Sequence, residues 1–182
     1  MKWIDLYRLA SIFINSTQEK LTRVYYFSAY ASWLREPQKR HRRYVAALQA
    51  RGVTPVMGYF KERLEECKKC GHRWIGHVEK ETDVRIASHL IRGVCRSEFD
   101  RVLMISADSD LVPAIEMARS IAPEIPITLV LPPGRRNHAD SLRKVASSTC
   151  HIKINHLERS LLPDKIITVS GKRIVRPPEY DP

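Results

Sequence analysis

Apolar residues along the chain follow two patterns, short continuous runs and a spacing of three or four residues. The helical spacing covers about residues 5–14 and again about residues 82–95, where Thr82 is the expected N-cap. The runs RVLMIS (101–106) and PITLVL (126–131) are short and apolar, as in strands that are buried on both faces of a parallel sheet. Strands therefore alternate with helices, which predicts crossover connections and a sheet that is covered on both sides.

The same reading places the remaining elements. We expect helices at 36–52, 109–121 and 137–147, strands at 23–30, 53–64 and 150–154, irregular chain through CKKCGHRWIGH, and a small hairpin in ITVSGKRIV. The predicted fold class is a three-layer α/β/α sandwich with a mainly parallel, Rossmann-like sheet. Residues 1–162 form the predicted domain, and 163–182 are a C-terminal extension.

The chain of 182 residues has 31 Lys and Arg against 20 Asp and Glu, a formal charge of +11. This balance favours a polyanionic partner, most simply nucleic acid, over a soluble protein that is merely basic, because the charge is clustered, with five basic residues in 35–43. No apolar run reaches membrane-spanning length, so no membrane partner is expected, and the start has no signal-peptide pattern. Four scattered cysteines favour a reducing, cytoplasmic compartment.

Three carboxylates lie where such a sheet would carry its site. Asp108 and Asp110 follow strand 101–106, and Asp83 lies in the first turn of the preceding helix. Converging carboxylates repel one another unless a cation is present, and hard oxygen ligands suit Mg²⁺ or Mn²⁺. The alternative for any one of them is a helix cap, and Asp110 is the clearest candidate for that role.

The blocks EKETDVRIASHLI, FDRVLMISADSDLVPAIEMAR, LVLPPGRRNHADSLRKVA and LERSLLPDKI resemble the NYN domain, a branch of the PIN-like nucleases. The resemblance runs from about residue 2 to residue 166. The resemblance implies a PIN-like fold and a metal-dependent ribonuclease activity, with Asp83, Asp108 and Asp110 at the positions of the family's acidic motif.

The expected substrate is single-stranded RNA.

One feature of that family is absent from the sequence. Its members open with a strand that ends in an Asp-Gly-x-Asn-like motif, whereas this chain opens with Lys-Trp-Ile-Asp-Leu, which resembles the segment after that strand. Without this strand the fold would lack a further carboxylate and expose sheet surface, which a second copy or a partner chain could cover. The alternative function is therefore a catalytically impaired RNA-binding or protein-interaction module of the same fold.

A second candidate metal site lies in residues 66–78, which resemble a zinc knuckle. Cys67, Cys70, His72 and His77 offer sulfur and nitrogen ligands for a structural, tetrahedral Zn²⁺. The alternative is a reduced loop whose thiols bind nothing.

Other residues are candidates for substrate binding. Ser106 and Ser109 flank the acids, and a role in orienting a metal-bound water or capping the helix is favoured over a serine nucleophile, because no His lies nearby in sequence. Phosphate contacts are assigned to a further set of basic residues, Arg40, Arg43, Arg135 and Arg136. An aspartyl-phosphate phosphatase is disfavoured, because its Asp-x-Asp motif comes early in the chain and here it lies past the middle.

Overall fold

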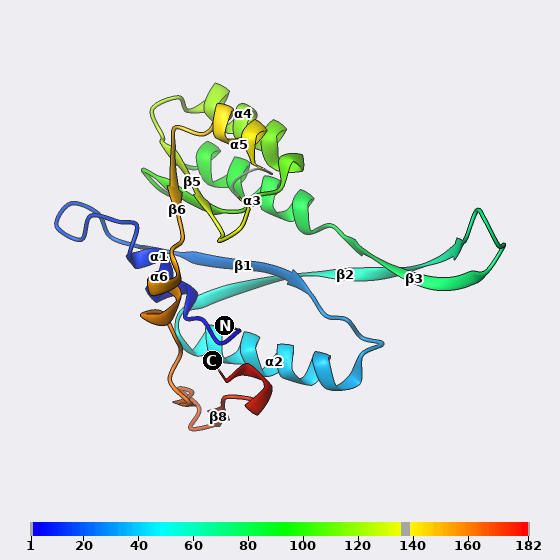
Figure 1. Ribbon diagram of the computed structural model, residues 1–182. Helices are drawn as coiled ribbons and strands as arrows, with labels where there is room; N and C mark the ends of the chain where they lie inside the picture. Colours follow the sequence, from blue (N-terminus) through cyan, green and yellow to red (C-terminus); the bar gives the residue numbers. More distant parts are fainter. Residues whose placement is uncertain (1, 136–138, 182) are drawn as a thin grey trace.

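The computed structural model describes residues 2–135 and 139–181 (Figure 1). Its helices are α1 (Leu6–Ser11), α2 (Arg35–Ala50), α3 (Thr82–Cys95), α4 (Val112–Ile121), α5 (Asp140–Val145) and α6 (Ile154–Glu158), with the 3-10 turns η1 (Ser109–Leu111) and η3 (Pro178–Tyr180). Its strands are β1 (Val24–Ala29), β2 (Val53–Glu66), β3 (Arg73–Lys80), β4 (Val102–Ile105), β5 (Ile127–Leu131), β6 (Ser148–His151), β7 (Lys165–Ile167) and β8 (Arg173–Val175).

The strands confirm the predicted α/β class. β1 pairs in parallel with β2, and β4, β5 and β6 pair in parallel in that order. Within the described residues these pairings make two three-stranded sheets, β1-β2-β3 and β4-β5-β6, where the sequence predicted one. Helices cover the sheets, with α2 and α3 on opposite faces of β1 and β2 (Figure 1).

A long β-hairpin projects from the body of the molecule (Figure 1). β2 pairs with β1 up to Gly58 and with β3 from Tyr59 onward, so its second half leaves the sheet as an antiparallel ribbon. We call residues 59–80 the arm. The prediction of irregular chain through CKKCGHRWIGH was wrong for its second half, because residues 73–77 belong to β3 and pair with the end of β2.

Helix ends differ from the predicted ones by a few residues. The N-cap of α3 is Glu81, held at a positive φ of 71°, and Thr82 is the first helical residue. The Thr82 hydroxyl donates to the Glu79 carboxylate, so Thr82 links the end of the arm to the helix and does not cap it. The predicted helix at 109–121 begins as η1 and continues as α4.

The largest core lies between α3, α4, α5 and the sheet β4-β5-β6, around Ile115, Leu129 and Leu142. A second core gathers Trp3 and Leu48 with Ile166 and Ile174 of the C-terminal hairpin β7–β8, which confirms that predicted hairpin. The C-terminal extension therefore packs against the N-terminal segment and α2. In the part of the chain that the structure describes, no helix combines the length and apolar character needed to cross a membrane.

Candidate active site

Asp108 and Asp110 lie immediately beyond the carboxyl end of β4, and Asp83 lies in the first turn of α3. The two segments meet because α3 packs against η1 and α4. Asp108 is the N-cap of η1: its carboxylate accepts a hydrogen bond from the Asp110 backbone N–H at 3.0 Å. Its own N–H donates to the Ser106 hydroxyl at 3.1 Å. The capping role that the sequence suggested for Asp110 therefore belongs to Asp108.

The carboxylates act on one another electrostatically. The pKa of Asp83 is raised above its usual value, first by partial burial and then by the negative charges of Asp108, Asp110 and Glu79. A carboxylate feels its neighbours in this way only when they lie close to it, so the predicted trio shares one region of the surface. Glu79, near the end of β3, adds a fourth negative charge to that region.

Sequence reasoning did not assign Glu79 to this group. The signal available was its position in EKETD, four residues before Asp83. The sequence did not reveal the register of β3. This register pairs Glu79 with Phe60 and so brings the strand to the start of α3. We call Glu79, Asp83, Asp108 and Asp110 the acidic group.

The donor chemistry of the acidic group fits a hard divalent cation. Among the residues that the structure describes, no three Asp, Glu, His or Cys side chains already converge as a closed ligand set. Mg²⁺ does not need a closed set, because it keeps several waters and binds through one or two carboxylates. Asp83, Asp108 and Asp110 are the side chains that would hold it, and the cation would relieve the repulsion that raises the pKa of Asp83.

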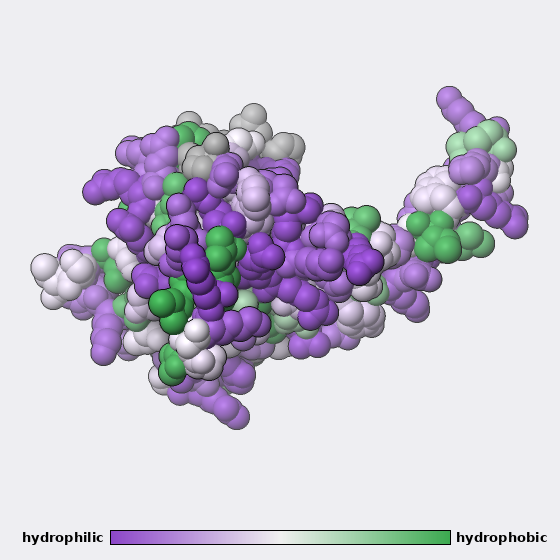
Figure 2. Space-filling view, turned by 90° about the horizontal axis from the view of Figure 1, so that it is seen from below, coloured by the Kyte–Doolittle hydropathy of each residue, from purple (hydrophilic) through white to green (hydrophobic). Residues whose placement is uncertain are grey.

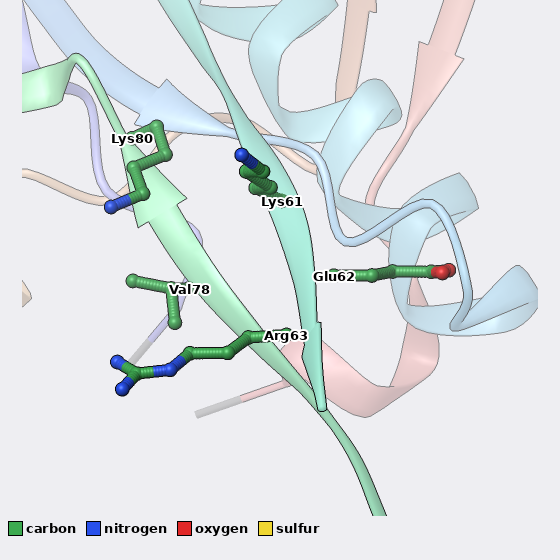
Figure 3. Close-up of a pocket in the computed structure, with 5 residues that line it drawn as sticks. All are labelled: Lys61, Glu62, Arg63, Val78 and Lys80. Atoms are coloured by element: carbon green, nitrogen blue, oxygen red, sulfur yellow. The ribbon is translucent and has the colours of Figure 1, made fainter. Parts of the chain in front are cut away.

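One face of the arm is basic. Lys61, Arg63 and Lys80 line an open cavity of about 290 Å³ with Val78, while Glu62 points away from them (Figure 3). The pairing explains this division, since Lys61 lies opposite Val78 and directly paired residues project from the same face of a ribbon. The sequence analysis had not assigned these three cations to the substrate.

The basic residues that the sequence predicted for phosphate binding lie outside the arm. Arg40 and Arg43 belong to α2, which covers the face of β1 and β2 opposite α3 (Figure 1). Arg40 pairs with Glu179 at 3.0 Å, so it holds the C-terminal segment. Arg135 is exposed in the turn after β5, and Arg136 lies outside the described residues. Ser109 is the exposed first residue of η1, next to Asp108.

The predicted zinc ligands are not gathered into one site. Cys67 and Cys70 lie in the turn at the tip of the arm, and both are free thiols. His72 stacks against Trp74, whereas His77 lies within β3, opposite Glu62, with its ring stacked on Trp33 at a centroid distance of 3.5 Å. The strand pairing therefore holds His77 away from the tip, and the two cysteines remain as neighbours.

Comparison with known proteins places this arrangement in a family. A fold comparison finds a Vibrio parahaemolyticus protein of unknown function, known from a crystal structure, with a TM-score of 0.54 and 19% identity over 87% of this chain and 82% of that one. No curated protein matches the chain. The family model of the NYN domain matches residues 3–154, a span that includes Asp83, Asp108 and Asp110. The chain therefore belongs to the NYN domain family, a PIN-like family of the nuclease type.

Proposed function

We propose that the protein hydrolyses RNA phosphodiester bonds at the acidic group with Mg²⁺ or Mn²⁺. The observation that carries the proposal is the meeting of Asp83, at the start of α3, with Asp108 and Asp110, beyond the end of β4, where α3 packs against η1. Capping explains Asp108 alone, whereas several negative charges collected at the end of a parallel strand are what a cation-dependent site requires. Membership of a nuclease-type family supports the same assignment.

The residues of the site have distinct roles in the proposed reaction. Asp83 and Asp110 supply carboxylate oxygens, while Asp108 does so and also fixes η1 through its bond to the Asp110 N–H. Ser106 orients the Asp108 backbone by accepting its N–H. A bound divalent cation would supply an activated water and stabilise charge on the phosphate.

The basic face of the arm supports RNA as the substrate. Lys80 is three residues from Asp83, so the cations of this face lead toward the acidic group. Tyr59 and Trp74 are 49% and 43% exposed on the same ribbon, and exposed aromatic rings can stack on unpaired bases. Phosphate contacts along the arm would place a single strand beside the carboxylates.

The direct experiment incubates the purified protein with a single-stranded RNA and, in parallel, with the DNA of the same sequence. We expect cleavage of the RNA with Mg²⁺ or Mn²⁺, and none after the metal is removed with a chelator. Cleavage that persists in the chelator, or none with either metal, would contradict the proposal.

A second function has a specific observation in its favour. No three metal-ligating side chains converge within the described residues, and a site too open to hold the metal would leave a fold that binds RNA without cutting it. The same experiment separates the two, because that function predicts a stable RNA complex with no cleavage under any metal condition.

A further inference from the structure

The tip of the arm is a tight turn built around two cysteines. The Cys67 N–H donates to the His72 carbonyl at 2.8 Å, and the Gly71 N–H donates to the Cys67 carbonyl at 2.8 Å. Gly71 takes a φ of +70°, a conformation that suits glycine and lets the chain reverse within residues 68–71. The turn therefore fixes Cys67 and Cys70 side by side at the outer end of the hairpin.

The same turn favours the thiolate that metals bind. The backbone N–H groups of Lys69 and Cys70 donate to the Cys67 sulfur, and the Cys70 thiol adds a further bond. Lys68 and Lys69 add positive charge in the turn itself. Hydrogen bonds and nearby cations stabilise a thiolate, and the thiolate is the form that coordinates a metal.

Two thiolates fill only half of a tetrahedral zinc site. In the described part of this chain, no third Cys, His, Asp or Glu side chain joins them as a ligand. His72 and His77 are each stacked against a tryptophan. Two ligands from outside the chain would complete the tetrahedron.

The outer arm also carries apolar surface beside this turn. Leu64 and Ile75 are cross-strand partners, so they project from one face, and they are 66% and 60% exposed. Figure 2 shows hydrophobic residues gathered on the outer part of the arm. Leu64 alternates along β2 with Arg63, which places this apolar pair on the opposite face from the basic cavity.

We propose that Cys67 and Cys70 form half of a zinc site that a second copy of this chain completes, with the Leu64–Ile75 faces of the two arms packed together. A two-fold dimer brings the same patch and the same pair of thiolates from each copy, which gives four sulfur ligands and a self-complementary apolar contact. Because the arm projects from the body (Figure 1), the tips can meet away from the acidic group. The site is independent of the proposed nuclease activity.

The test titrates the reduced, metal-free protein with Co²⁺, a spectroscopic substitute for Zn²⁺, and follows mass by sedimentation. We expect the bands of tetrahedral thiolate-bound cobalt to saturate at one ion per two chains, while the protein converts from monomer to dimer. Zn²⁺ should displace the cobalt and keep the dimer, and a chelator should return the monomer.

Variants make the test specific. Cys67→Ser and Cys70→Ser should each abolish the cobalt bands and the metal-dependent dimer, while Cys95→Ser, at an exposed thiol outside the arm, should leave both unchanged. Leu64→Glu with Ile75→Glu should raise the dimer dissociation constant at least about tenfold. Saturation at one ion per chain in a monomer, the absence of binding, or a dimer that forms without metal and is lost on reduction would each overturn the proposal.

Discussion

At the scale of single residues, the acidic group combines structural and electrostatic roles. Asp108 caps η1, so its position has a local cause, but a cap does not explain why Asp83 lies beside it. Partial burial, and after it the negative charges of Asp108, Asp110 and Glu79, raise the pKa of Asp83. A carboxylate held close to other negative charges is typical of a functional site, because stability alone would favour a neutral residue there.

The raised pKa predicts a pH-dependent gain in stability for Asp83→Asn. The native-state pKa of Asp83 lies above its usual value of 3.8, so the native state binds the proton more tightly than the unfolded chain does. The charged carboxylate therefore destabilises the native state above the raised pKa, and this loss fades as the pH falls. Since Asp83 is exposed, we expect a gain of only about 0.5 kcal/mol at pH 7 in chelator, vanishing near pH 3.8.

Urea unfolding of both proteins across this pH range measures the difference. Glu124→Gln, an exposed carboxylate in the loop before β5, is the matched control and should show no such trend. If Asp83→Asn is less stable than the wild type at pH 7, and the deficit is as large at low pH, the electrostatic account of Asp83 is contradicted.

At the scale of elements, α3 positions Asp83 by close packing at its other end. Gly93 lies in the last turn of α3, and a Cβ at this position would overlap the ring of Phe99. Phe99 in turn packs on the core that holds β4 and α4. The helix therefore approaches the chain before β4 as closely as a glycine allows.

Gly93→Ala should destabilise the protein by about 1–3 kcal/mol, because the added methyl group forces Phe99 out of its place. Ser88→Ala, at an exposed position of the same helix, should change stability by no more than about 0.5 kcal/mol. Urea unfolding with both variants checks this, and equal stability of Gly93→Ala and the wild type would refute the packing argument.

Elements with a clear apolar pattern were predictable, and the arm was not. β4 and β5 are short apolar runs, and α3 has a helical repeat, so the position of Asp83, Asp108 and Asp110 at one edge followed from the sequence. β3 carries charged and aromatic residues on both faces of a ribbon with little core beneath it. Its existence depends on pairing with β2, a contact that local pattern does not encode, and Glu79 and the basic face were missed with it.

At the scale of the whole molecule, the basic residues of α2 and those of the arm lie on different surfaces. The basic stretch of α2 lies on one side of β1 and β2, whereas the arm leads to the acidic group on the other (Figure 1). Among the described residues, the arm brings a row of cations toward the proposed site of cleavage, with Lys80 three residues from Asp83. The clustering of charge in the sequence pointed to α2, because the cations of the arm are spaced along two strands and meet only after pairing.

This division predicts how salt affects RNA binding. Each phosphate contact adds about 0.7 to the slope of log affinity against log salt for a single strand. The triple variant Lys61→Ala, Arg63→Ala and Lys80→Ala should therefore lower the slope by about 2. Fluorescence anisotropy in chelator measures it, with Arg43→Ala of α2 as the control. A slope that falls for the control and not for the triple variant would assign RNA to α2.

The cleavage rate of Asp108→Asn tests the central claim most directly. Asparagine is as good an N-cap as aspartate, so η1 should keep its structure while the carboxylate charge is lost. With Mn²⁺ and single-stranded RNA we expect a rate at least about 100-fold below that of the wild type, and an unchanged rate for Asp140→Asn on α5. Cleavage by Asp108→Asn at the wild-type rate would show that the acidic group is not the active site.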